Sequence, residues 1–259
     1  MFRFSAITAV LFLLAGTSVT AGDIFIREES FSYSVDTGSD VIISNISGDI
    51  TIEEGDSDNL LIECSIEGEN IEEVEAIEIE CTYINGVICE VIYPDNWVEI
   101  TEAAVDFRVS LPCSMELNLV MLTVNGCISL RSGAGTSLVE IINGSAILEG
   151  FSGELIVNVV SGEIDLVDIR GLSVVNIVKG TITGTIDSID RDIEISTVEA
   201  FIDLVIDCPA IVSVTTMTGD LDIHGVEIVQ DLVGSSAEFG EGEFIIEIST
   251  YSGDVRIQH

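Results

Sequence analysis

Apolar and polar residues alternate along most of this chain, and in its middle third the alternation restarts at regularly spaced glycines. Seven glycines stand nine residues apart without interruption: Gly126, Gly135, Gly144, Gly153, Gly162, Gly171 and Gly180. Around every second one, large apolar residues stand two before, two after and four after the glycine, as Val160, Ile164 and Leu166 do around Gly162; Ala146 and Gly184 break the pattern. Such alternation predicts a strand with one buried face, so we expect all three positions to be buried. The glycine, often preceded by Ser, Asn or Thr, predicts a tight turn with positive φ.

The nine-residue period corresponds to one turn plus one short strand, so eighteen residues make one full coil of two strands. The sequence therefore predicts an all-β fold, a flattened parallel β-solenoid of the β-helix or β-roll type whose coils stack about 4.8 Å apart. An antiparallel sandwich of short strands is the alternative, because its turns recur at a similar spacing. A sandwich does not require identical spacing, however, so the solenoid is the favoured interpretation.

The repeat continues more loosely on both sides of this regular stretch. Further copies occur at residues 46–50, 198–202, 217–221 and 251–255. In the late part of the chain, we expect the glycine-containing residues 234–242 to form a loop that protrudes from a coil. Residues 22–112 contain unevenly spaced strands, so we predict a partly antiparallel β region that caps the solenoid repeats of residues 113–259.

The first 21 residues have the layout of a cleavable signal peptide. Arg3 precedes an apolar run from about Phe4 to Ala15, and Val19 and Ala21 match a cleavage site. The apolar run is shorter than the roughly 20 residues that span a bilayer. We therefore expect an exported protein of the periplasm, the cell surface or the extracellular space, with no membrane span in the mature chain.

Cysteines in an exported chain favour disulfides, although their spacing leaves the connectivity open. The cysteines are Cys64, Cys81, Cys89, Cys113, Cys127 and Cys208. Asn85 and Gly86 mark a hairpin turn between Cys81 and Cys89. A two-residue loop places Thr82 opposite Cys89, whereas a three-residue loop with Gly86 left-handed places Cys81 there. A Cys81–Cys89 disulfide thus depends on the register of the hairpin.

The charge of the chain is extreme, with 46 acidic residues against 8 basic ones and a formal net charge of −38. Such a field repels nucleic acid and anionic lipid, because binding to phosphates needs Lys or Arg. Disorder is disfavoured, since 47% of the residues are hydrophobic and they alternate regularly. We interpret the acids mainly as a solvating coat, with salt adaptation or cation binding as the alternative.

With these repeats, the chain resembles the adhesin-like β-strand-repeat domain of unknown function found in bacterial and archaeal envelope proteins. The matching segments are residues 47–52, the strand ending at Pro112, the turns between Val124 and Ile164, and residues 252–255. The resemblance covers about residues 40–259. It implies a β-solenoid at the cell envelope with no catalytic residues to transfer. Ala200 in place of glycine, the cysteines and the charge depart from the usual pattern.

Motifs for catalysis are missing from the sequence. The two histidines, His224 and His259, have no triad-like context, and no spacing of His or Cys matches a zinc site. The glycine-rich segments lack the features of phosphate and dinucleotide loops. We therefore expect a protein that is not an enzyme. The alternative is a carbohydrate-active β-helix enzyme that uses a pair of its many carboxylates.

Stacking of the repeat suggests two ladders of side chains. Asp203 and Asp222 stand at equivalent positions, and we expect them to be neighbours in the stack with Asp220 nearby, forming a weak Ca²⁺ site. No other cofactor is expected. Glu140, Asn158 and Asn176 stand eighteen residues apart, and we expect Asn158 and Asn176 to form an amide ladder with a structural role.

The functional prediction is a non-catalytic, exported, adhesin-like β-repeat protein that acts as a binding or structural module at the cell envelope. Its partner is expected to be a glycan, an envelope protein or a second copy of itself. Two alternatives stay open: the carbohydrate-active enzyme and a calcium-dependent surface assembly protein.

Overall fold

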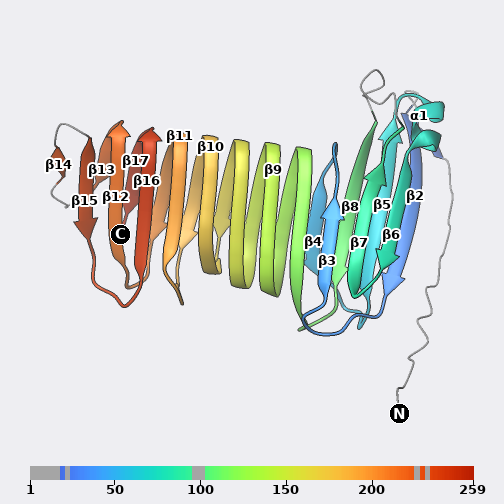
Figure 1. Ribbon diagram of the computed structural model, residues 1–259, viewed down its shortest axis with the longest axis horizontal. Helices are drawn as coiled ribbons and strands as arrows, with labels where there is room; N and C mark the ends of the chain where they lie inside the picture. Colours follow the sequence, from blue (N-terminus) through green and yellow to red (C-terminus); the bar gives the residue numbers. More distant parts are fainter. Residues whose placement is uncertain (1–17, 21–23, 95–102, 225–227, 231–233) are drawn as a thin grey trace, which may run out of the picture.

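The structure is a computed structural model that describes residues 18–20, 24–94, 103–224, 228–230 and 234–259. The expected signal peptide, residues 1–21, lies almost wholly outside the described residues. Figure 1 shows an elongated molecule in which strands run across the long axis, one behind another. The chain passes between a front and a back layer of strands, and the buried side chains fill the space between them.

Extended segments dominate the described chain. The elements are β1 (Ser18–Thr20), β2 (Ile24–Tyr33), β3 (Asp40–Ser44), β4 (Ile50–Glu54), β5 (Leu60–Gly68), α1 (Ile71–Ala76), β6 (Glu78–Tyr83), β7 (Gly86–Ile92), β8 (Ala104–Leu111), β9 (Glu116–Val167), β10 (Arg170–Ile186), β11 (Ile193–Ile206), β12 (Ile211–Thr218), β13 (Leu221–Ile223), β14 (Val229–Gln230), β15 (Ser235–Phe239), β16 (Ile245–Ser252) and β17 (Val255–Gln258). β9 and β10 are continuous extended segments that bend repeatedly at glycines.

The regular stretch pairs in parallel with an offset of eighteen residues. β10 lies beside β9 with Asn176 opposite Asn158 and Gly180 opposite Gly162. All seven evenly spaced glycines have positive φ, from +85° at Gly171 to +156° at Gly162. The predicted positive-φ turns and the eighteen-residue offset of this stretch are therefore confirmed.

At the glycine corners, the alternation of buried and exposed side chains shifts by one residue. This corrects the prediction that the residue two before the glycine is buried. Ile164 and Leu166, two and four residues after Gly162, are buried as expected. Val160, two residues before it, is 48% exposed, and Val159 is buried in its place. The cause is geometric. Between Val159 and Ile164 the chain rounds the outside of the corner, so the side chains on this bend point to solvent.

The N-terminal region joins the stack as well as ending it. β3 and β4 lie beside β9 in parallel, with Ile50 opposite Ile128, so residues 40–54 form one more coil. Beyond them, β5 pairs antiparallel with both β2 and β8, as expected for this region. Figure 1 shows these strands at one end of the molecule. The division of the chain at residue 112 stays a prediction.

The hairpin of β6 and β7 adopts the three-residue register. Cys81 lies opposite Cys89, and a disulfide joins them across a Cα–Cα distance of 4.1 Å. The left-handed residue is Asn85, with φ +61°, rather than Gly86. Gly86 is needed for another reason, because a Cβ there would lie 2.6 Å from the carbonyl oxygen of Asp40. The other four cysteines are free.

Removal of this disulfide is expected to lower the free energy of unfolding by about 2.5 kcal/mol, because its short loop no longer restricts the unfolded chain. The double variant Cys81→Ser/Cys89→Ser should therefore melt at a lower temperature than the parent protein in circular dichroism. Dithiothreitol should lower the melting temperature of the parent and leave that of the variant unchanged. Equal melting temperatures for parent and variant would contradict the prediction.

The C-terminal coil lies between two coils that precede it in the sequence. β16 pairs in parallel with β11 on one side and β12 on the other, and β17 likewise lies between β11 and β13. The expected loop at residues 234–242 is wrong in part, because residues 235–239 form β15. This strand pairs antiparallel with β12 and covers its outer edge.

The fold is thus all-β, with one mixed, unclosed sheet. Its pairing is parallel through the middle and includes antiparallel strands near both ends. Among the described residues, no helix combines the length and the apolar character that a membrane crossing requires.

Candidate functional site

The front layer of strands carries an unusually apolar surface. We define the apolar face as the outward side chains at alternate positions of residues 42–46, 120–124, 138–142, 156–160 and 174–178, which lie side by side on β3, β9 and β10. All of these side chains are apolar except Ser44, Glu140, Asn158 and Asn176. A groove of about 500 Å³ runs across this face. One acid among so many neighbouring outward positions contrasts with the net charge of −38.

One edge of the apolar face continues along the glycine corners as a row of exposed apolar side chains, which we call the corner row. In spatial order it consists of Ile46, Val124, Ile142, Val160, Val178, Val198, Tyr251 and Met217. Its members stand two residues before Ala200 or a repeat glycine, and all but the half-buried Val124 are 39–58% exposed. The corner row is therefore a direct consequence of the shift in burial at each corner.

Amide side chains are stacked across the middle of the apolar face. Asn176 Nδ2 donates to Asn158 Oδ1 at 2.9 Å, and Asn158 Nδ2 donates to Glu140 Oε1 at 3.4 Å. The predicted amide ladder is confirmed. A second pair that the sequence analysis did not predict joins Asn143 Nδ2 to Asn125 Oδ1 at 3.2 Å. These contacts tie the outward polar groups of neighbouring coils to one another.

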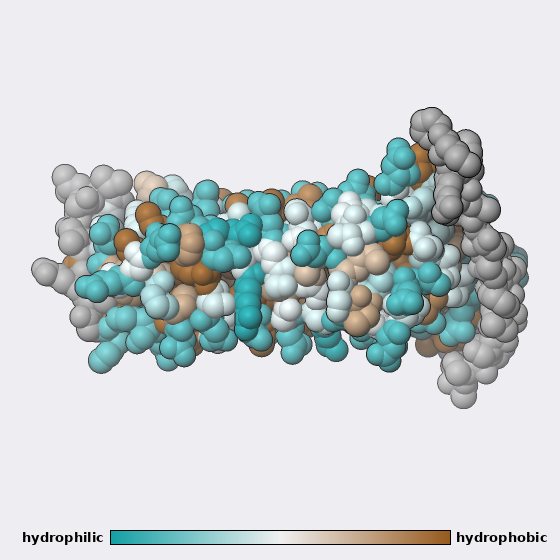
Figure 2. Space-filling view, turned by 90° about the horizontal axis from the view of Figure 1, so that it is seen from below, coloured by the Kyte–Doolittle hydropathy of each residue, from teal (hydrophilic) through white to brown (hydrophobic). Residues whose placement is uncertain are grey.

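The back layer carries more charged side chains than the apolar face, although Val167, Phe201 and Val205 are also exposed on it. Its outward side chains include Glu53, Arg108, Asp165, Asp203 and Arg256. Figure 2 shows the lower long edge of the molecule, where hydrophilic side chains project along both rims and hydrophobic ones form small groups between them.

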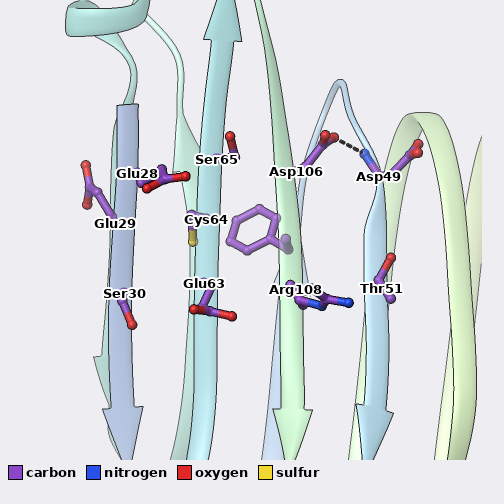
Figure 3. A pocket seen from close by; sticks show the side chains of 11 residues that line it. Glu28, Glu29, Ser30, Asp49, Thr51, Glu63, Cys64, Ser65, Asp106 and Arg108 are labelled. Carbon is purple, nitrogen blue, oxygen red and sulfur yellow. Dashed lines mark hydrogen bonds between the residues drawn. The ribbon is translucent and has the colours of Figure 1, made fainter. Parts of the chain in front are cut away.

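A groove of about 630 Å³ crosses β2, β5, β8 and β4 at the N-terminal end, and we call it the acidic groove. Figure 3 shows Glu28 on β2, Glu63 on β5, and Asp106 and Arg108 on β8 along it, with Asp49 above β4. Arg108 Nε donates to Glu53 Oε1 at 3.0 Å and offsets part of the negative charge. This groove is where the structure comes nearest to the carboxylate pair of a glycan-active enzyme.

Two carboxylates of the acidic groove, those of Asp49 and Asp106, already accept hydrogen bonds from the backbone. Asp49 N–H donates to Asp106 Oδ1 at 2.8 Å, the bond drawn in Figure 3. Asp49 Oδ1 in turn accepts from Cys127 N–H at 2.7 Å. At the far end of the stack, Asp220 N–H donates to Asp254 Oδ1 at 2.9 Å in the same way. An aspartate after a corner glycine thus satisfies a backbone donor of the neighbouring coil.

The acidic groove also holds a thiol. Burial raises the pKa of the Cys64 thiol, and the negative charges of Glu29 and Glu63 raise it further. Because the thiolate is the reactive form, Cys64 is a poor nucleophile at neutral pH.

Asp106→Asn is expected to leave stability unchanged or to raise it slightly at pH 7. Burial raises the pKa of Asp106, the hydrogen bond from Asp49 N–H opposes this, and the charge of Asp49 adds to it. A raised folded-state pKa means that the folded protein binds the proton more tightly, so stability falls as the pH rises above about 4. Asn removes this loss and keeps the acceptor oxygen. Since the side chain is partly exposed, the gain should be about 0.5 kcal/mol or less.

Thermal melts between pH 4 and 7 test this, with Asp106→Ala as the control. Alanine removes the acceptor for Asp49 N–H, so it should cost about 1 kcal/mol across the whole range. A loss of stability in Asp106→Asn equal to that of Asp106→Ala would show that the charge itself is required.

The carboxylates predicted to hold calcium are separated by an arginine, which corrects the expected adjacency of Asp203 and Asp222. β17 lies between their strands, so Arg256 pairs with Asp203 on one side and Asp222 on the other. Arg256 Nη1 lies 3.6 Å from Asp203 Oδ2, and Arg256 Nε lies 3.2 Å from Asp222 Oδ2. Asp220 holds no place in this cluster, since its backbone pairs toward Asp254.

The two histidines follow neighbouring strands, His224 after β13 and His259 after β17. His224 is exposed, and the ring of His259 lies 4.7 Å from that of Phe239. In the part of the chain that the structure describes, no three His, Cys, Asp or Glu side chains are grouped so as to hold a metal ion. A calcium site stays a prediction that rests on the sequence alone.

Several solved structures are similar to this chain. They include a putative cell adhesion protein from Clostridium sporogenes ATCC 15579 (12% identity, TM-score 0.34, covering 89% of this chain and 99% of that chain). A putative adhesin from Bacteroides fragilis NCTC 9343 has 9% identity and a TM-score of 0.40, covering 92% of this chain and 98% of that chain. A putative lipid binding protein from Parabacteroides distasonis ATCC 8503 has 9% identity and a TM-score of 0.23, covering 90% of this chain and 97% of that chain. Two of these three structures are described as putative adhesion proteins.

No family model and no curated protein matches the chain.

Proposed function

We propose that this protein is an exported, non-catalytic, adhesin-like β-solenoid that acts as a binding or structural module at the cell envelope, with the apolar face as its binding surface. One observation carries the proposal: a contiguous apolar surface on a molecule with a net charge of −38. Large exposed apolar patches are rare on proteins that act alone, and they mark interaction sites.

The geometry of the apolar face supports a binding role. Its side chains project from paired strands, so the backbone beneath them is held by the sheet. Ile and Val are stiff at χ1, so little conformational entropy is lost when a partner covers them. The corner row extends the surface along the repeats, which suits an extended partner better than a small molecule.

The non-catalytic part of the proposal rests on the partners of the carboxylates. Asp49 and Asp106 accept backbone hydrogen bonds, and Asp203 and Asp222 neutralise Arg256. Each of these acids therefore has a structural task. The carbohydrate-active enzyme is kept as a second candidate, because Asp106 has a raised pKa beside Asp49 in an open groove. Hydrolysis of polysaccharides by the parent protein, lost in Asp106→Asn, would favour that candidate.

Binding of residues 22–259 to a glycan array and to immobilised envelope proteins tests the proposed function. The front variant Val160→Glu/Val178→Glu should lose binding, because it places charges on the apolar face. The back variant Val167→Glu/Val205→Glu is the matched control, since these valines are also exposed but lie on the back layer. Equal binding by the two variants would contradict the proposal that the apolar face is the binding surface.

The same measurements with millimolar calcium and with chelator distinguish the third candidate, a calcium-dependent surface assembly protein, from the other two. A calcium-dependent assembly protein should change its sedimentation when calcium is added. The ion pairs of Arg256 with Asp203 and Asp222 predict instead that calcium leaves sedimentation unchanged.

A further inference from the structure

We propose that the apolar face binds the same face of a second copy of this chain, so that the protein forms a two-fold symmetric dimer. This inference rests on the proposed function, because it names the partner of the same binding surface. A two-fold contact pairs one patch with itself, which is the commonest way in which soluble proteins assemble.

Charge limits how two such molecules can approach each other. Each copy carries a formal charge of −38, so contact through the charged back layer or the acidic groove would bring like charges together. The apolar face has one carboxylate, that of Glu140, and Asp40 lies beside the face at the start of β3. It is therefore the surface at which a second copy meets the least repulsion.

The spacing of the side chains matches that of a second copy. Rows on the apolar face repeat at the strand spacing of about 4.8 Å, and an identical face repeats at the same spacing. Side chains of two such faces can interdigitate, as in β-sandwiches, where packed sheets lie about 10 Å apart. The rows contain mostly Ile, Val and Leu, the side chains that fill such interfaces in sheets.

The available surface suits a weak contact. The five coils of the apolar face span about 24 Å at the strand spacing, and the alternate positions on each strand span about 13 Å, or roughly 300 Å². The corner row extends this area over three further coils. Stable interfaces of standard size bury about 800 Å² on each partner, so the face suits a dimer in equilibrium with its monomer.

The ends of the molecule are poorer sites for self-association. At the C-terminal end, β15 pairs antiparallel with the outer edge of β12, and β14 pairs in turn with β15. At the other end, β2 and β5 are paired antiparallel. Antiparallel strands across an open end of a repeat protein hinder end-to-end stacking.

Salt and Glu140 should control the dimer in predictable directions. Salt screens the repulsion between the two copies, since the Debye length falls from about 10 Å at 0.1 M to about 3 Å at 1 M. Dimerisation should therefore strengthen with salt, whereas binding to a basic partner would weaken.

Glu140→Gln removes the one charge of the face and keeps an oxygen acceptor for Asn158 Nδ2. It should tighten the dimer by about tenfold, because a buried unpaired charge is costly.

Sedimentation velocity of residues 22–259 at 0.1 M and 1 M NaCl tests the inference. We expect a monomer–dimer equilibrium that shifts toward dimer at 1 M, and a further shift in Glu140→Gln. The front variant Val160→Glu/Val178→Glu should weaken the dimer by at least about 100-fold. The back variant Val167→Glu/Val205→Glu should leave it unchanged. Circular dichroism of all variants checks that they are folded.

A parent protein and a Glu140→Gln variant that both stay monomeric at 1 M NaCl would overturn the dimer. The array measurement then decides the proposed function separately. If the front variant still loses binding to a glycan or an envelope protein, the apolar face is a binding surface for another partner. If the front and back variants bind equally there too, both proposals fail. Dimers that the back variant disrupts and the front variant does not would also overturn the inference.

Discussion

Replacing Gly162 with alanine is expected to destabilise the protein by more than about 4 kcal/mol, a large fraction of the roughly 5–15 kcal/mol by which ordinary domains are stable. Gly162 has φ +156° and lies in the middle of the stack of corner glycines. A methyl group there would overlap the carbonyl oxygen of Gly144 in the neighbouring coil. Gly144 meets Gly126 in the same way, and Gly180 meets Gly162, so no coil can move aside without disturbing the next one.

Gly38→Ala is the matched control for this variant. Gly38 also has a positive φ, +79°, but a Cβ there would meet nothing within 4 Å. Its replacement should cost only about 1–2 kcal/mol, the strain of a left-handed alanine. Chemical denaturation followed by circular dichroism measures both variants. Equal losses in the two variants would show that φ alone, and not the close approach of neighbouring coils, requires glycine at the corners.

Ala200 marks the limit of this argument. It stands where the repeat has glycine, and it is absent from the residues with positive φ in the described chain. Its corner therefore adopts another backbone conformation, so Ala200 is no precedent for alanine at Gly162. The neighbouring coil still approaches this corner closely, because a Cβ at Gly253 would overlap the carbonyl oxygen of Ala200.

The regular part of the fold could be predicted from the sequence because its cause is local. Glycine at a fixed spacing sets both the turn and the pairing offset, so the register of Asn176 over Asn158 follows from counting residues. The Cys81–Cys89 pairing was reduced to two registers for the same reason. In contrast, residues 234–242 show too little alternation to reveal a strand, and β15 owes its pairing to the exposed edge of β12.

The candidate surface could be predicted only in part. Apolar residues two before each glycine are plain in the sequence, but alternation alone places them on the buried side. Only the path of the chain around the corner turns Val160 outward and Val159 inward. Thr197, Thr216 and Thr250, three before the corner, are buried although they are polar, so the sequence pattern there favoured the wrong face.

The predicted neighbours Asp203 and Asp222 were wrong because spatial order departs from chain order. Counting along the sequence makes their strands adjacent, yet the last strand of the chain enters between them. Arg256 supplies the positive charge that two stacked carboxylates require. No local pattern signals such an insertion, since it depends on where the chain returns after β15.

Deleting residues 245–259 is therefore expected to detach the C-terminal end of the molecule. β11 and β12 are each paired with β16 and not with one another, so the deletion leaves two unpaired edges. It also removes Ile246, Ile248, Val255 and Ile257, which are at most 1% exposed. Each such side chain contributes about 2 kcal/mol by burial, so the loss of all four exceeds what a terminal coil can withstand.

Hydrogen exchange measured by mass spectrometry tests this expectation. Residues 211–223 should lose protection in the truncated protein, while the coils between Gly126 and Gly180 keep theirs. Deletion of His259 alone is the control, because this exposed residue lies outside β17 and its removal costs only the ring contact with Phe239. A synthetic peptide of residues 245–259 should restore protection, since an added strand can pair with both open edges. Full protection of residues 211–223 without the peptide would mean that β12 can pair with β11 directly, and that the inserted coil is dispensable.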